Sequence, residues 1–409
     1  MRDSDYLIPR YYAYRATNSA GLYLPIAIYF LVDRGYSNGF VLFSYAVFSL
    51  ATVAAEIPTG YLGDLVGRRG SLAIGAGLRV VALSTYPFVD TKLAILAIHV
   101  IWAAGRAFRS GTVDAWLYEV LQARFDESEY ARVEGRGSTV LLVTSAAGAI
   151  AGGFLYTLDP AYPFIANAGL ALLGLPILFT FPAVATEVSD DEVFTVREAV
   201  RTLRLQAGRP AVRWLVVYAA VFQATFSVTR SLEQPALSEV GIPVAGLGVL
   251  YAGFKLVSAG AASTAGWFEE TLGARGVFAL LVPLYAVAYA SLAVLPLAIV
   301  PLLFVNRSRR LITRPVRNQY LNDRLEDVGR ATVLSGAAMV LSTAAALAKF
   351  ASSAAAAGLP AVEFLPWVGV GGAAVGGVLW LATSPVRGGR DGFLDAGSDA
   401  ESCTAAPTD

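Results

Sequence analysis

Three charged residues, Arg15, Glu56 and Asp114, stand within long apolar runs of the sequence. A rise of about 1.5 Å per residue places each of them roughly 9 to 12 Å from the midpoint of its run, toward the same side. A charge in hydrocarbon costs about 3 kcal/mol or more unless it is paired, so such residues are candidates for function. A carboxylate at this depth can bind or release a proton as water or an arginine approaches it. We therefore predict a proton-binding site at this level, with a static salt bridge as the alternative.

Further polar residues of the apolar runs could line the same path through a membrane. These candidates are Asn18, Arg106, Arg109, Glu233, Arg309 and Arg310. Glu233 is near Gln223 and Arg230 in the sequence, which suggests a polar cluster in the second part of the chain. His99, the single histidine, is expected to be a packing residue rather than a proton relay. Together with the first three residues, the candidates form a predicted cavity for protons and substrate.

Membrane helices must position these residues. Hydrophobic residues make up 56% of the 409 residues, and the mean hydropathy is +0.57, which is too apolar for a soluble protein of this length. Apolar runs of about 20 residues, enough to cross roughly 30 Å of hydrocarbon, recur along the chain. The twelve predicted spans are 13–32, 40–62, 71–90, 93–118, 137–157, 162–184, 213–236, 244–265, 276–295, 298–321, 331–355 and 364–383. The predicted fold class is an all-α integral membrane protein.

Basic residues are concentrated on alternate loops. Arg68 and Arg69 lie in one such loop and Arg132 in the next, whereas the intervening loops hold only Arg34 and Lys92. Arginine and lysine accumulate on the cytoplasmic side of membrane proteins. An even number of spans with both termini in the cytoplasm of a plasma membrane is therefore expected. The formal net charge is zero and gives no indication of a nucleic-acid partner.

The predicted tenth span is unusually polar. The stretch NRSRRLITRPVR, residues 306–317, contains five arginines. Such a helix cannot face lipid on all sides, because each unpaired charge would be costly there. Either this helix lines water or the span boundary is wrong. The first possibility is preferred, since ending the membrane at Val305 would leave eleven spans and break the distribution of basic loops.

Two segments of the chain repeat in the other half. The stretch GYLGDLVGRR, residues 60–69, recurs in GWFEETLGAR, residues 266–275, and Arg106 with Leu117–Glu119 matches Arg310 with Leu321–Asp323. We therefore expect two pseudo-symmetric six-helix bundles over residues 1–184 and 213–384. Residues 185–212 would form a cytoplasmic loop with an amphipathic helix, or a solvated connector helix, and residues 385–409 a disordered acidic tail. This parallel repeat is typical of secondary transporters with a substrate site near the midplane.

The stretch GYLGDLVGRR is similar to the loop signature between helices two and three of the major facilitator superfamily. The resemblance implies a cytoplasmic gate in which Asp64 and Arg68 or Arg69 bind the ends of neighbouring helices and hold the outward-open state. Gly60 and Gly67 would allow close backbone approach. The second copy of the gate consists of Gly266, Glu270, Gly273 and Arg275. Alternatively, Arg68 and Arg69 only follow the distribution of positive charge.

A further element resembles the proton-coupled drug antiporters of this superfamily. The stretch GAIAGG, residues 148–153, is similar to their fifth-span G-P-x-x-G-G element, with Ala149 in place of the proline. Gly148, Gly152 and Gly153 would let two helices pack tightly, and such packing is also the simpler explanation of the glycines. The overall resemblance extends from about Tyr12 to Thr383.

The leading hypothesis is a proton-coupled antiporter that exports small amphipathic molecules by alternating access. An organic anion carrier in either direction is the alternative, because arginines outnumber carboxylates in the spans, and a transporter-like sensor without flux is the third possibility. Enzyme motifs, a metal-ligand cluster and a P-loop are absent from the sequence, so no catalytic residue, metal or cofactor is expected. The expected partners are a small-molecule substrate, protons and the lipid bilayer, without nucleic acid, and the expected state is a monomer.

Overall fold

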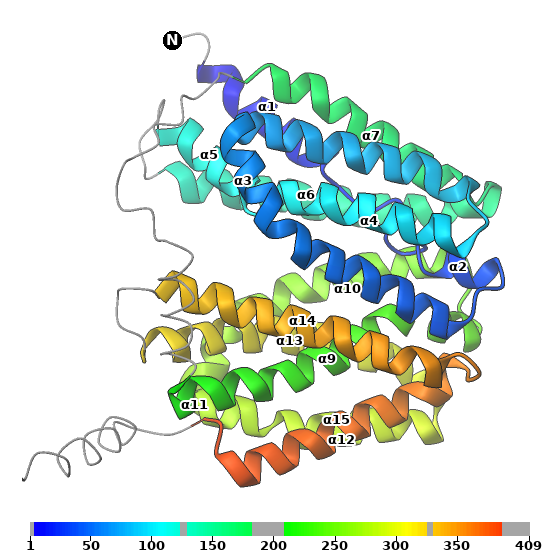
Figure 1. Ribbon diagram of the computed structural model, residues 1–409, viewed down its shortest axis with the longest axis vertical. Helices are drawn as coiled ribbons and strands as arrows, with labels where there is room; N and C mark the ends of the chain where they lie inside the picture. The colour runs from blue at the N-terminus through cyan, green and yellow to red at the C-terminus, as the bar shows by residue number, and fades with distance from the viewer. Residues whose placement is uncertain (1–3, 123–128, 182–207, 325–329, 387–409) are drawn as a thin grey trace, which may run out of the picture.

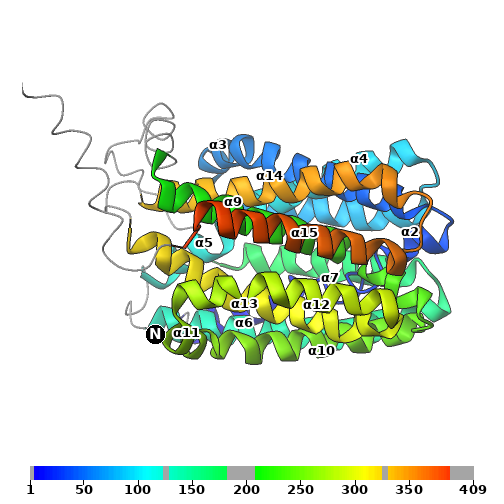
Figure 2. The same ribbon diagram turned by 90° about the horizontal axis from the view of Figure 1, so that it is seen from below.

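The computed structural model describes residues 4–122, 129–181, 208–324 and 330–386, and these form two stacked helical bundles (Figure 1). The first bundle contains α1 (Ser4–Thr17), α2 (Tyr29–Asp33), α3 (Asn38–Thr85), α4 (Lys92–Arg109), α5 (Thr112–Gln122), α6 (Glu129–Leu158) and α7 (Tyr162–Phe179). The second contains α9 (Pro210–Glu239), α10 (Val244–Ser263), α11 (Ala265–Ala279), α12 (Leu281–Val294), α13 (Ile299–Asn322), α14 (Arg330–Ala356) and α15 (Ala361–Thr383). The long helices run along a common direction (Figure 2).

The predicted all-helical membrane fold is confirmed. Within the described residues, eight helices are long and apolar enough to cross a membrane, or nine when Gly266–Ala279 and Leu281–Val294, bent by 63°, count as one span. The helix α13 fills the place of the tenth span but is too polar to pass this test, and in α10 only Val244–Ser258 forms an apolar run. The predicted amphipathic helix of the 185–212 loop and the tail from residue 387 lie outside the described residues.

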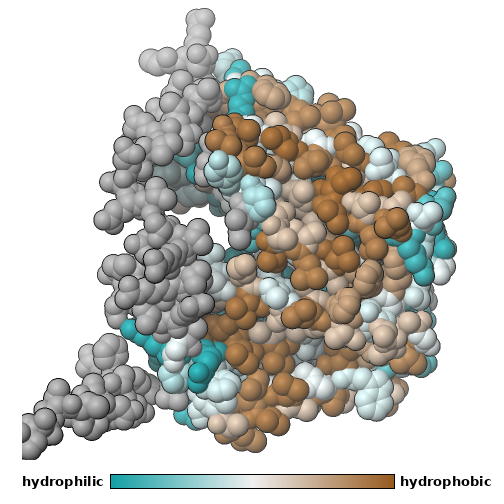
Figure 3. All heavy atoms as spheres, in the orientation of Figure 1, coloured by the Kyte–Doolittle hydropathy of each residue, from teal (hydrophilic) through white to brown (hydrophobic). Residues whose placement is uncertain are grey.

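The outer surface of the bundles is apolar. Large hydrophobic side chains such as Val287, Val294 and Leu381 are exposed, and brown residues cover much of the face shown in Figure 3. The interior of the second bundle is filled by tightly packed aromatic side chains, among them Phe222 and Tyr285, whose rings lie 4.9 Å apart. An exposed apolar surface of this extent is stable only when lipid covers it.

The predicted first span, 13–32, is wrong as a continuous helix. The helix α1 ends at Thr17, the chain runs through turns over residues 18–28, and α2 resumes at Tyr29. Backbone groups without helical partners are costly inside a membrane unless side chains bind them. Arg79 donates to the carbonyl oxygens of Asn18 and Ser19, and Asn167 Nδ2 donates to that of Ser19 at 3.0 Å. These buried side chains make the break possible.

The two repeated loops have the same backbone conformation. Gly67 lies within α3 at φ 73° and ψ 167°, and Gly273 lies within α11 at φ 62° and ψ 170°. Only glycine adopts a positive φ readily, because a Cβ would clash with the backbone. Each glycine therefore turns the chain between two helices. We call the end of the molecule that carries these turns the Gly67 end, and the other, with turns at Gly35 and Gly241, the Gly35 end.

The two bundles are in contact toward the Gly35 end. A Cβ at Gly39 would overlap the backbone of Ser353, and one at Gly248 would overlap the carbonyl oxygen of Ala149. Asn38 Nδ2 also donates to Leu359 O at 3.0 Å. Backbones that approach this closely leave no passage between the bundles there. The Gly35 end is therefore closed.

Candidate functional site

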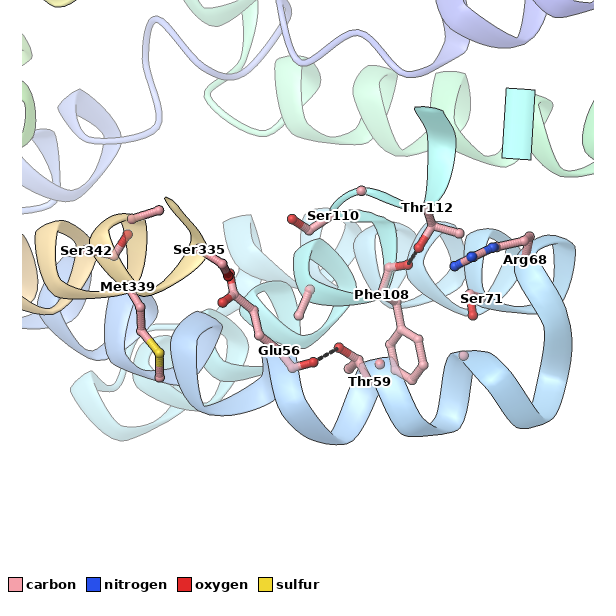
Figure 4. A pocket seen from close by; sticks show the side chains of 15 residues that line it. Glu56, Thr59, Arg68, Ser71, Phe108, Ser110, Thr112, Ser335, Met339 and Ser342 are labelled. Atoms are coloured by element: carbon pink, nitrogen blue, oxygen red, sulfur yellow. Dashed lines mark hydrogen bonds between the residues drawn. The ribbon is translucent and has the colours of Figure 1, made fainter. Parts of the chain in front are cut away.

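A cavity of about 540 Å³ lies between the bundles toward the Gly67 end. Its walls come from α3, α4 and the turn before α5 in the first bundle and from α14 in the second. In Figure 4, Glu56 of α3 lies beside Ser335 of α14, and Thr59, Met339 and Ser342 line the same cavity. The remaining lining residues are Gly60, Gly63, Arg68, Ser71, Ala107, Phe108, Ser110, Gly111, Thr112 and Ala338. A cavity rich in hydroxyl groups suits water and a polar solute.

The structure brings Arg15 and Asp114 together, and adds a carboxylate that sequence reasoning missed. Arg15 Nη1 lies 3.9 Å from Asp114 Oδ1, and Arg15 Nη2 lies 3.5 Å from Glu134 Oε1. Ser138 links the group, since its hydroxyl accepts from Arg15 at 3.0 Å and donates to Glu134 at 2.6 Å. Glu134 was missed because the predicted fifth span began at residue 137, whereas α6 begins at Glu129.

Glu56 does not join this group, and the prediction of one three-residue cluster is wrong. Within the described residues, the carboxylate of Glu56 makes no ion pair, and it faces the cavity rather than Arg15. Depth along a helix says nothing about rotation around its axis, so residues at one level need not meet. The first bundle thus holds a cluster in which a buried Arg15 meets the partly exposed carboxylates of Asp114 and Glu134, and a separate carboxylate in the cavity.

Asn18 and Arg109 support the break in the first span. Arg109 donates to Asn18 Oδ1, and Asn18 Nδ2 donates to Tyr14 O at 3.1 Å. Arg79, which holds the carbonyl oxygens of the break, was not among the predicted site residues. A signal for it existed, because an arginine in the middle of the predicted span 71–90 requires a partner.

Glu233 lies at the centre of a charged cluster in the second bundle. Its side chain has no solvent exposure and accepts from Arg230 of the same helix and from Arg307 of α13, the latter at 2.7 Å. Arg230 also donates to the hydroxyl of Tyr251 at 2.7 Å, and the Arg307 guanidinium lies 3.7 Å from the centre of the Phe254 ring. Two guanidinium groups and one carboxylate leave this cluster with one positive charge.

Gln234, the next residue, connects the second bundle to the break in the first. Its Oε1 accepts from the backbone amides of Ile28 and Tyr29, both at 2.9 Å. Its Nε2 donates to Leu24 O at 2.8 Å and to the Tyr251 hydroxyl at 3.0 Å. A buried primary amide has two donors and two acceptor sites, and here all four are used. Gln234 therefore joins the bundles on the closed side of the molecule.

Unpaired cations from both bundles lie near one another across the interface. Arg106 of the first bundle is within electrostatic range of Arg310 and Lys349 of the second. Lys349 is buried and donates to Ser49 Oγ at 2.7 Å, and Arg310 lies 5.2 Å from the Phe226 ring. In the described part of the chain, none of these three cations has a carboxylate partner. The interface is strongly electropositive as a result.

Arg309, the neighbour of Arg310, points into the second bundle instead. It is buried against the rings of Phe226 and Tyr285, at 5.8 and 5.2 Å from their centres. Its Nε and Nη2 atoms have no hydrogen-bond partner among the described residues. Contact with aromatic faces partly offsets the cost of burying a guanidinium. Of the arginines of the polar tenth span, Arg309 is therefore buried inside the protein, whereas Arg310 and Arg314 are exposed.

The contacts of the predicted gate agree with the expectation for Arg69, which binds the end of α7, but not for the glycines. A Cβ at Gly60 or Gly67 would meet nothing within 4 Å, so these glycines do not serve close approach; Gly67 is required by its positive φ. Arg68 Nε lies 3.2 Å from Glu119 Oε1, and Arg69 donates to the carbonyl oxygens of Phe179 and Phe181 at the end of α7. The gate arginines thus bind partners within their own bundle.

The other gate residues form fewer contacts. The side chain of Asp64 lies outside the described part of the structure. Glu270 and Arg275 are exposed, with no ion pair among the described residues, and a Cβ at Gly266 or Gly273 would meet nothing within 4 Å. The second copy therefore repeats the turn of the first but not its arginine contacts.

The glycines of the fifth span lie against both bundles. A Cβ at Gly152 would overlap the carbonyl oxygen of Leu22 in the break, and one at Gly148 would lie 3.3 Å from the Gly21 Cα. A Cβ at Gly153 would lie 3.0 Å from the carbonyl oxygen of Ala245 in the second bundle. Small residues permit this close packing of backbones. Gly148 and Gly152 allow α6 to pack closely against the irregular first span.

His99 lies in an aromatic environment. It is fully buried, its Nδ1 lies 2.8 Å from the carbonyl oxygen of Ile95, and its ring packs edge-on against Tyr45 and Tyr86. No ionisable side chain among the described residues bonds to it. This position suits packing.

Known proteins share these features. The model of the Major Facilitator Superfamily matches residues 15–308. An uncharacterised MFS-type transporter, YxaM of Bacillus subtilis (strain 168), is 25% identical over 241 residues, or 57% of this chain and 58% of that protein. The chain thus matches less than two thirds of this curated relative.

Solved structures of transporters have a similar fold. The nucleoside transporter NupG superposes with a TM-score of 0.75 at 13% identity, covering 95% of this chain and 98% of that one. A bacterial homologue of the lysosomal transporter Spinster, in an inward-facing and occupied conformation, gives 0.68 at 14% identity, covering 94% and 97%. A D-xylose–proton symporter gives 0.67 at 14% identity, covering 91% and 96%. With the apolar helices and the family match, these similarities show that the chain is a multi-pass membrane protein that belongs to the Major Facilitator Superfamily, a family of transporters rather than enzymes.

Proposed function

We propose that this protein is a secondary active transporter that moves a small organic anion across the plasma membrane by alternating access. The cavity between the bundles, with walls from both halves, is the transport path. It is closed at the Gly35 end by Gly39, Asn38 and Gln234, and hollow at the Gly67 end. A substrate site between two bundles that rock against each other is typical of this architecture.

The distribution of basic residues supports an orientation. Arg68 and Arg69 lie at the Gly67 end, and loops of this charge face the cytoplasm in membrane proteins. With the Gly67 end in the cytoplasm, both termini are cytoplasmic, and the structure corresponds to an inward-open state. The Spinster homologue with a similar fold was solved in an inward-facing state.

The observation that carries the substrate class is the group of unpaired cations at the interface. Arg106, Arg310 and Lys349 come from both bundles and lack carboxylate partners among the described residues. Arg106 and Arg310 are exposed and can be reached by a solute, whereas Lys349 is buried, and a bound anion would neutralise positive charge that no carboxylate offsets. A permanent excess of positive charge therefore favours an anionic substrate.

A second candidate is the proton-coupled export of small amphipathic molecules. It is favoured by the Arg15 cluster, in which two carboxylates share one guanidinium, and by Glu56 in the cavity. A proton taken up there would change the balance of the cluster with Arg15 and could drive export.

Flux into proteoliposomes tests both candidates. Purified protein is reconstituted with an imposed proton gradient, and uptake of succinate, benzenesulfonate and inorganic phosphate is compared with that of tetraphenylphosphonium. Saturable uptake of an anion, lost in Arg310→Gln and retained in Arg213→Gln, supports the first candidate. Arg213 is a suitable control because it is exposed beside Trp214. Proton-driven movement of the cation supports the second candidate, and ligand binding without any flux would indicate a sensor.

A further inference from the structure

The cluster around Glu233 already binds a carboxylate. Arg230 of α9 and Arg307 of α13 both donate to its oxygens, and Tyr251 supplies a hydroxyl beside Arg230. Both arginines lie against the Tyr251 ring, Arg230 also donates to the Tyr251 hydroxyl, and Arg307 also lies over the ring of Phe254. Two guanidinium groups fixed in this way form a preorganised receptor for one carboxylate.

The arginines of this cluster are more exposed than Glu233, the carboxylate that they bind. The side chain of Arg230 is 32% exposed and that of Glu233 is 0% exposed. Tyr251, which accepts from Arg230, also accepts from Gln234, and Gln234 donates to Leu24 O of the first bundle, so the cluster lies beside the interface. Lys255 lies within range of both arginines and adds positive charge. An incoming anion would therefore meet the arginines before it met the carboxylate that they hold.

We propose that Glu233 is an internal substitute for the carboxylate of the substrate. In the empty protein it neutralises Arg230 and Arg307, and the substrate carboxylate replaces it on these arginines. The inference rests on the proposed function, because it assumes that the interface admits an organic anion. It assigns the subsite for the anionic head group and narrows the substrate to molecules with a carboxylate or a group of similar shape.

The replacement is coupled to the closed end through the neighbouring residue. Gln234 holds the break in the first span by Leu24, Ile28 and Tyr29. The following residue, Pro235, has no amide hydrogen, so α9 lacks a helical hydrogen bond at this point. When Glu233 leaves the arginines, this weakened turn lets Gln234 move with it. Binding at the cluster therefore releases the contact that keeps the Gly35 end closed.

Hydrogen exchange reports this release directly. The backbone amides of Ile28 and Tyr29 donate to Gln234, so their exchange should accelerate when a carboxylate binds. The probe is benzoate, added to the purified full-length protein in detergent, and benzamide is the uncharged control of the same shape. Faster exchange over residues 24–31 with benzoate but not with benzamide is expected. Benzoate binding without this change would overturn the coupling.

Three variants separate the steps. Glu233→Gln should bind benzoate at least about tenfold more tightly than the wild type, because the internal competitor is gone. Arg307→Gln should lose binding, and Gln234→Ala should retain binding while Ile28 and Tyr29 exchange fast without any ligand. Equal benzoate affinity in the wild type and Glu233→Gln would overturn the proposal that Glu233 occupies the site of the substrate carboxylate. If Glu233→Gln fails to fold, the wild-type exchange and the Gln234→Ala result still decide the coupling.

The outcome is distinct from that of the proposed function. Anion flux in proteoliposomes with unchanged exchange at Ile28 and Tyr29 would refute this inference and leave the transporter proposal intact. Benzoate-induced exchange without flux of any anion would do the reverse.

Discussion

The first helices of the two bundles differ in continuity and in the groups that their polar contacts bind. In the first bundle the helix is interrupted between α1 and α2, and Arg79 donates to the carbonyl oxygens of Asn18 and Ser19. In the second bundle α9 is continuous over 30 residues, and Arg307 forms an ion pair with the side chain of Glu233. The repeats therefore share a path through the membrane but not a role. The first bundle contains the irregular backbone and the arginine that binds it, and the second contains the Glu233 cluster and Gln234, whose amide binds the same backbone.

The largest expected effect comes from removing the support of the break. Arg79→Leu would remove the side-chain donor to the carbonyl oxygen of Asn18 and one of two donors to that of Ser19 in a buried site, which should cost about 3 kcal/mol. A lower thermal transition in detergent, with little change in Arg213→Leu, is the expected result. If Arg79→Leu were as stable as the wild type, the break would not depend on this arginine, and the contrast between the bundles would lose its basis.

The close packing of Gly152 against the break in the first span provides the next test. Gly152→Ala would place a methyl group on the carbonyl oxygen of Leu22, and overpacking of this kind costs about 2 kcal/mol. Gly169→Ala is the matched control, because a Cβ there would meet nothing within 4 Å. Thermal unfolding of the two variants should differ clearly. Equal transitions would mean that the first span shifts freely, contrary to a fixed break.

The turn that both bundles share should give a smaller effect. Gly67→Ala forces a side chain into a positive φ and should cost about 1 kcal/mol, whereas Gly60→Ala, in open helical surroundings, should be neutral or slightly stabilising. Chemical denaturation in mixed micelles can resolve this difference. A cost at Gly60 equal to that at Gly67 would point to a packing role for both glycines.

The smallest effect is expected at the outer loop. Arg34 Nη1 lies 3.0 Å from Asp90 Oδ1, but the Asp90 side chain is 85% exposed. Asp90→Asn should change stability by less than about 0.5 kcal/mol, since exposed ion pairs contribute little. A loss above that range, measured at low and high salt, would show that this loop takes part in closing the Gly35 end.

Much of the fold could be predicted from the sequence, because lipid demands long apolar helices and the basic loops alternate. The break could not, since residues 20–28 are mostly apolar and the partners of the backbone in the break come from Arg79, Asn167 and Gln234, far along the chain. The residues of the candidate site could be predicted from the sequence only in part. Charged residues could be recognised by their cost in a membrane, but Gln234 carries no charge and gave no signal. Rotation around a helix axis separated Glu56 from Asp114 despite their equal depth.

The interrupted first span also has a consequence for assembly. During synthesis, this segment enters the membrane long before its partners exist, and its free carbonyl and amide groups cannot rest in lipid alone. Arg79 and Asn167 complete one part of it, but Leu24, Ile28 and Tyr29 wait for Gln234, which is made when more than half of the chain has been inserted. The break in the first span therefore reaches its final structure only after Gln234 has been inserted.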